Sequence, residues 1–116
     1  MLYKCSNEEM ANAIKDFFIK KGLTSDILIY YDGKRISFDD GIPVVKEGYK
    51  ASKYFEFAVD DWVSMSFEGP FNHMMNYPCC LEDRQIVQEF EELLDSLGGY
   101  SEMGYAWSLN VVPNNN

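Results

Sequence analysis

The sequence predicts an α+β domain, in which an antiparallel sheet of three to five strands is covered on one face by an N-terminal helix and two later helices. Its 116 residues, 47% of them hydrophobic, are enough for one buried core. Helix-like and strand-like segments both occur, and a tight turn signal joins two of the strand-like segments, which favours antiparallel pairing. We therefore expect one domain over residues 1–116, with residues 113–116 as a frayed tail.

The first helix signal begins at Ser6. Ser6 followed by Glu9 forms a capping box, and apolar residues then recur at helical spacing until Gly22. The first turn is acidic, whereas the last turn contains Lys20 and Lys21. Both ends therefore match the helix dipole, which favours negative charge at the start and positive charge at the end.

The stretch ILIYYDGKRISF, residues 27–38, predicts a β-hairpin. Asp32-Gly33 lies between two β-rich runs and is a strong signal for a two-residue turn. The first run is apolar on both faces, so we expect it inside the sheet. Residues 39–52 follow as a predicted loop, because this segment contains glycines and a proline.

Residues 54–68 contain at least one further strand. Apolar residues alternate with serines over 62–67, whereas 54–59 could be a strand or irregular. After Gly69-Pro70, a short helix is predicted over 71–77, ending at Pro78.

A long helix is predicted over 82–97, with its apolar stripe formed by Ile86, Phe90, Leu93 and Leu97. Gly98 is the expected C-cap. The alternating segment YAWSLNVV, residues 105–112, predicts the last strand.

The net charge of −9 is distributed unevenly along the chain. Residues 1–53 contain nine basic and eight acidic side chains, whereas residues 54–116 contain eleven acidic side chains against Arg84 alone. Such a field repels nucleic acid and anionic membranes and attracts basic surfaces. We therefore expect a basic protein partner, with no direct binding of nucleic acid or membrane.

No apolar run approaches the roughly 20 residues of a membrane helix, and the N-terminus does not resemble a secretory signal. These features predict a cytoplasmic protein. The three cysteines, of which Cys79 and Cys80 are adjacent, are expected to be reduced thiols rather than a disulfide framework.

No catalytic signature is present, so the sequence predicts a protein that is not an enzyme and has no cofactor. His73 is the single histidine, and no serine or cysteine lies in a nucleophile-elbow motif. A zinc set of Cys5, His73, Cys79 and Cys80 is conceivable, but it lacks the usual ligand pairs separated by two to four residues. We therefore predict no metal site and no metal requirement for folding. The Asp39-Asp40 and Asp60-Asp61 pairs lack the alternating ligands of a calcium loop and predict turns.

The long helix has carboxylates in its last two turns, where the helix dipole disfavours them. A helical wheel places Glu92 and Asp95 opposite the apolar stripe, with Glu89 and Glu91 at its two borders, and predicts that these carboxylates face outward together. Local rules are broken most often at functional sites, so we expect a partner here, although solubility alone would also explain an acidic face. The predicted partner-binding residues are Glu89, Glu91, Glu92, Asp95, Asp60, Asp61, Glu68, Glu56 and Glu102.

The runs VSMSFEGPFNHMMNY and GYSEMGYAWSLNVV, together with the small size and acidity of the chain, resemble proteins of phages and mobile elements. Among these are inhibitors of the anti-CRISPR and antirestriction type. The resemblance implies a non-enzymatic inhibitor that presents carboxylates where a nuclease holds DNA phosphates. Two alternatives stay open: a general or antitoxin-like interaction module without DNA mimicry, and a small zinc-binding protein.

Overall fold

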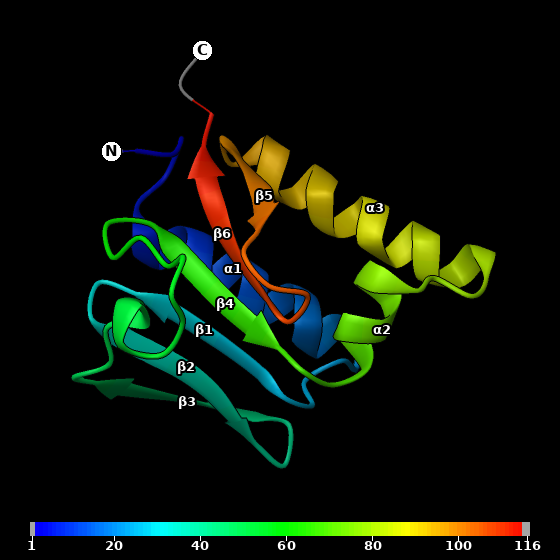
Figure 1. Ribbon diagram of the computed structural model, residues 1–116, viewed down its shortest axis with the longest axis horizontal. Helices are drawn as coiled ribbons and strands as arrows, with labels where there is room; N and C mark the ends of the chain where they lie inside the picture. Colours follow the sequence, from blue (N-terminus) through cyan, green and yellow to red (C-terminus); the bar gives the residue numbers. More distant parts are fainter. Residues whose placement is uncertain (1, 115–116) are drawn as a thin grey trace.

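The computed structural model describes residues 2–114, which form one six-stranded antiparallel sheet and three α-helices that share a core with it (Figure 1). The predicted α+β class is confirmed, but the predicted strand number was too low. The strands lie in the order β3-β2-β1-β4-β6-β5. The elements are α1 (Asn7–Lys21), β1 (Ile27–Tyr31), β2 (Lys34–Asp39), β3 (Ile42–Glu47), a 3₁₀ turn (Ala51–Lys53), β4 (Val63–Phe67), α2 (Pro70–Asn76), α3 (Leu81–Ser96), β5 (Gly99–Met103) and β6 (Ser108–Pro113).

The two edge strands, β3 and β5, were not predicted from the sequence. β3 lies in the segment that was predicted to be a loop, yet all six of its residues pair with β2. β5 follows α3 directly and pairs with β6 over five residues. Proline and glycine within these segments lower their strand propensity. Hydrogen bonds to a neighbouring strand, which propensity does not reveal, make them strands.

Several predicted boundaries also require correction. Residues 54–59 are irregular, and residues 105–107 form a turn before β6 rather than its first part. Pro113, predicted to be in the frayed tail, pairs with Gly99 in β5, and residues 115–116 lie outside the described part of the chain. α3 ends at Ser96 with Leu97 as its C-cap, and Gly98 follows with a left-handed φ of 85°.

The local signals near the N-terminus are confirmed. Ser6 and Glu9 form both hydrogen bonds of the capping box, each at 3.1 Å. In the turn from β1 to β2, Asp32 and Gly33 have φ values of 50° and 75°, as a two-residue hairpin turn requires. β1 lies inside the sheet, between β2 and β4.

The three helices and the sheet share one hydrophobic core. In Figure 1, α1 passes behind the sheet, and α2 and α3 lie beside it. Phe18 of α1 contacts Phe71 of α2 and Phe90 of α3, with ring centroids 4.8 and 5.7 Å apart. These rings pack on Met65 and Phe67 of β4 in the same buried cluster. None of the helices in residues 2–114 combines the length and the apolar character needed to cross a membrane.

The opposite face of the sheet is more polar and is partly covered by residues 48–62. Tyr30, Ala51 and Phe55 form a small second core there. Between β4 and β6, the Ser64 hydroxyl donates a hydrogen bond to Asn110 Oδ1 at 2.7 Å. Asn110 Nδ2 in turn donates to the carbonyl of Phe57 at 2.6 Å. The loop is therefore attached to the sheet by hydrogen bonds as well as by apolar contacts.

Tyr3 connects the N-terminal segment to the centre of the sheet. Its hydroxyl donates to the carbonyl of Val111 in β6 at 2.5 Å and accepts a hydrogen bond from the amide of Val63 in β4 at 2.9 Å. Burial raises the pKa of Tyr3 to about 12, so the hydroxyl keeps its proton at neutral pH. The amide of Lys4 also donates to the carbonyl of Leu97 at 2.9 Å.

Candidate functional site

The outer face of α3 is the largest run of acidic side chains on a single element. α3 buries Phe90 and Leu94 against the sheet and the other helices. Its opposite side is exposed and polar, and includes a shallow open hollow between neighbouring turns. We call this surface the α3 outer face, formed by Gln85, Gln88, Glu89, Glu92 and Asp95.

Two of the four predicted α3 carboxylates contact neighbouring elements. Glu89 forms an ion pair with Lys21 at the end of α1. Glu91 accepts a hydrogen bond from the Ser101 hydroxyl in β5 and is half-buried. Glu89 and Glu91 lie at opposite borders of the exposed side of α3, where the helical wheel placed them. The prediction that all the carboxylates face outward together was wrong for Glu91, which faces the sheet edge.

Glu92 and Asp95 are exposed, as predicted. Glu92 accepts a hydrogen bond from Gln88 Nε2 at 2.9 Å, one helical turn earlier. Asp95 lies in the last turn of α3, which has no basic side chain to balance the helix dipole. Among the described residues, the ion pair with Lys21 is the only salt bridge at the α3 outer face. Most of its negative charge is therefore unneutralised.

The five other predicted acids do not extend this face. Asp60 accepts hydrogen bonds from the amide and the hydroxyl of Ser52, at 3.0 and 2.6 Å, which lower the pKa of its carboxyl. It therefore stabilises the loop over residues 48–62. Glu102 lies opposite Asn110 on the face of the sheet away from the helices. The sheet thus separates both residues from α3.

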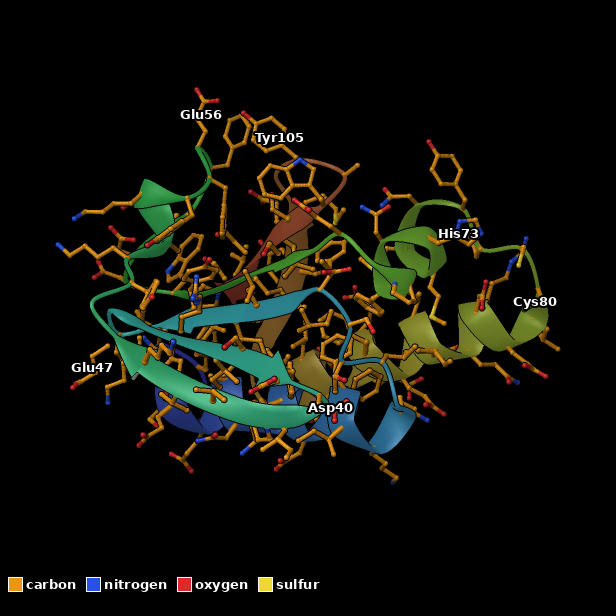
Figure 2. All side chains as sticks on the ribbon, turned by 90° about the horizontal axis from the view of Figure 1, so that it is seen from below. Asp40, Glu47, Glu56, His73, Cys80 and Tyr105 are labelled. Atoms are coloured by element: carbon orange, nitrogen blue, oxygen red, sulfur yellow. The ribbon has the colours of Figure 1, made fainter. Side chains whose placement is uncertain are left out.

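Glu56, Asp61 and Glu68 are exposed at three further places. Glu56 accepts a hydrogen bond from the Tyr105 hydroxyl, which raises the pKa of this tyrosine. Figure 2 shows this pair projecting from the side of the sheet away from α1. Asp61 precedes β4, and Glu68 follows it beside a polar pocket of about 250 Å³ that also contains Asp26. The nine predicted residues therefore form separate groups rather than one patch.

An aromatic row crosses the face that carries the 48–62 loop. Each ring contacts the next ring in the row, and the centroids of neighbouring rings are 5.2 to 6.1 Å apart. Phe57 and Tyr54 are about half exposed, at 53% and 48%. The members, in order, are Phe57, Tyr105, Trp107, Phe55, Tyr30, Tyr54 and Tyr49. Half-exposed aromatic residues of this kind are enriched at protein interfaces.

Arg35 lies at one end of the aromatic row. Its guanidinium is 3.9 Å from the ring centroid of Tyr49, a cation–π contact. Its Nε is buried and has no hydrogen-bond partner among the described residues. The row was not predicted from the sequence, because its members come from three segments that only the fold brings together: β1, the 48–62 loop and the turn before β6. The high aromatic content of these segments was the only indication of the row in the sequence.

The turn between α2 and α3 holds two exposed thiols. The Cys79 thiol donates a hydrogen bond to Asp83 Oδ2 at 3.3 Å, and the Cys79 amide donates to the same oxygen at 3.3 Å. The carboxylate raises the pKa of the Cys79 thiol, and the hydrogen bonds lower the pKa of Asp83. Cys5, by contrast, is buried in the main core. The conceivable four-residue zinc set is therefore not assembled.

Comparisons of the chain with known protein families, with curated proteins and with solved structures found no match.

Proposed function

We propose that this protein is a non-enzymatic inhibitor that binds a basic nucleic-acid-handling protein, such as a CRISPR nuclease, through the α3 outer face. The observation that carries the proposal is the exposed, largely unneutralised row of Glu89, Glu92 and Asp95. A groove that binds nucleic acid presents lysine and arginine to phosphates. Carboxylates presented on a rigid helix offer such a groove an alternative anionic ligand.

The spacing of these carboxylates suits this role. The three residues recur every third position, and an α-helix rises about 1.5 Å per residue, so successive positions are about 4.5 Å apart along the axis. One DNA strand carries a charge about every 3.4 Å along its axis. Glu92 and Asp95, which form no salt bridge among the described residues, therefore have an axial spacing comparable to that of successive phosphates, whereas Glu89 is paired with Lys21.

The rest of the second half of the chain supports the same partner. Arg84, the single base after residue 53, lines the hollow between α2 and α3 together with Met74 and with Gln88 of the α3 outer face, and it forms no salt bridge among the described residues. The overall negative field steers a cationic partner toward the protein before contact and speeds association at low salt.

The test compares two variants of equal net charge. The outer-face variant carries Glu89→Gln, Glu92→Gln and Asp95→Asn. The matched control carries Asp16→Asn, Asp39→Asn and Glu47→Gln, three exposed acids of the first half. Each protein is immobilised and exposed to lysate, and bound proteins are identified by mass spectrometry and then purified for binding kinetics.

We expect a DNA- or RNA-binding protein to bind the parent and the control, to be displaced by duplex DNA, and to associate about tenfold or more slowly with the outer-face variant as steering is lost. If the association rate falls equally in the outer-face variant and in the control, the cause is the net charge of the protein, and a specific role for α3 is contradicted. If neither duplex DNA nor high salt displaces the captured protein, DNA mimicry is contradicted.

A second candidate function is an interaction module without DNA mimicry, of the antitoxin-like or regulatory kind. The exposed end of the aromatic row, at Phe57 and Tyr105, favours this alternative. A Phe57→Ser variant distinguishes the two functions. If it abolishes partner capture while the outer-face variant does not, the partner binds the loop side of the sheet.

A further inference from the structure

The turn between α2 and α3 brings together three side chains with metal-binding atoms. The Sγ atoms of Cys79 and Cys80 and a carboxylate oxygen of Asp83 all lie within 4.8 Å of one another. Neighbouring cysteines in regular structure rarely reach the same ion. Here Cys80 is the N-cap of α3 and Asp83 lies in its first turn, so the start of the helix directs the carboxylate back toward both thiols.

We propose that Cys79, Cys80 and Asp83 form a binding site for a thiophilic divalent cation, with Zn²⁺ as the reference ion. Zinc binds thiolate sulfur at about 2.3 Å and carboxylate oxygen at about 2.0–2.2 Å, so two donors of a tetrahedral ion lie roughly 3.3–3.8 Å apart. Cys79 Sγ is already 3.3 Å from Asp83 Oδ2. Small side-chain rotations are sufficient to bring the second thiol to the same ion.

The site is open rather than closed. Both cysteines are exposed and Asp83 is half-buried, so three protein donors hold the ion and the fourth position faces solvent. Sites of this composition keep one exchangeable position, unlike structural zinc sites with four protein ligands. His73 of α2 lies at the same end of the molecule as Cys80 (Figure 2).

This site differs from the zinc set that the sequence suggested. Its third ligand is Asp83, and Cys5 does not take part because it lies in the main core. None of the three ligands belongs to either hydrophobic core. The fold therefore does not depend on the ion, and the metal-free protein stays folded.

The test uses the metal alone. Reduced, metal-free protein is titrated with ZnCl₂ by calorimetry, and in parallel with Co²⁺, whose thiolate charge-transfer and d–d absorption reports sulfur ligation and tetrahedral geometry. We expect one ion per chain with both bands. Cys79→Ser combined with Cys80→Ser should abolish zinc binding. Asp83→Asn should weaken zinc affinity about tenfold or more, because loss of a group that only supports a metal ligand already costs about tenfold.

Cys5→Ala is the matched control, because it removes a thiol outside the site and should keep one-to-one binding. Serine at position 80 is a favourable N-cap, so the double variant should keep the circular dichroism of the parent. Three results would overturn the proposal: no saturable binding, binding unchanged by the double variant, or one ion per two chains. Each of these is independent of whether the α3 outer face binds a partner.

Discussion

α1 and α3 pack side by side on one face of the sheet, but their ends are built differently. α1 begins with a complete capping box and ends with Lys20 and Lys21. α3 begins at Leu81, its N-cap Cys80 forms no side-chain cap hydrogen bond, and Asp95 lies in its last turn. Both are continuous α-helices of similar length, with 15 and 16 residues. Burial of the apolar face, with Glu82 and Asp83 in the first turn, therefore stabilises α3 without a side-chain cap or a basic last turn.

The largest expected effect tests this shared dependence on burial. We expect Phe18→Ala in α1 and Phe90→Ala in α3 each to lower the free energy of unfolding by about 3–5 kcal/mol. The two rings contact each other, so the double variant should lose less than the sum of the single losses. Chemical denaturation of all four proteins measures this. Strict additivity would mean that the contact between the two rings contributes no coupling energy.

The next effect concerns the N-terminus of α1. Ser6→Ala removes the hydroxyl that accepts a hydrogen bond from the Glu9 amide, and we expect a loss of about 1 kcal/mol. Ser96→Ala, near the end of α3, is the comparison variant: it removes a hydroxyl that donates to the Leu93 carbonyl at 2.7 Å but caps no helix N-terminus. If the two variants lose the same stability in thermal or chemical unfolding, the capping box contributes nothing specific.

The converse change should stabilise α3. Cys80→Ser places a capping hydroxyl where the described structure has no side-chain cap hydrogen bond, and we expect a gain of about 0.5–1 kcal/mol. Cys79→Ser is the same chemical change one residue before the cap and should give no gain. Unfolding must be measured with a chelator, so that metal binding does not contribute. A gain in both variants would contradict the capping explanation.

The smallest effect tests the acidic end of α3. Glu92→Gln with Asp95→Asn relieves the conflict with the helix dipole, so we expect stability to be unchanged or to rise by about 0.3–1 kcal/mol. Association with a basic partner should slow in the same variant. Paired measurements of melting temperature and binding kinetics decide the matter. A lower melting temperature with intact binding would show that these carboxylates serve the fold.

The sequence predicted those parts of the molecule that depend on nearby residues. The α1 capping box and the Asp32-Gly33 turn are formed within a few positions of the chain, so pattern and propensity were sufficient to find them. β3 and β5 were missed because their identity depends on hydrogen bonds to other strands, and Pro43 and Gly99 weaken the local signal.

The candidate site shows the same difference between features that depend on nearby residues and features that depend on distant ones. The wheel correctly placed Glu92 and Asp95 on the exposed side of α3. It could not reveal that Glu91 contacts Ser101, because this contact depends on where β5 lies. The cluster of Cys79, Cys80 and Asp83 spans only five residues, but it was not predicted, because the zinc set suggested by the sequence contained cysteine and histidine alone.

The position of β6 has a consequence for biosynthesis. β6 lies between β4 and β5, although it is the last of the six described strands to be made. The hydroxyl of Tyr3 needs both Val63 and Val111 as partners, so the N-terminal segment cannot dock until residues 108–113 have left the ribosome. Until then β4 has an unpaired edge, which is prone to wrong pairing. Folding on the ribosome therefore waits for nearly the whole domain to be synthesised.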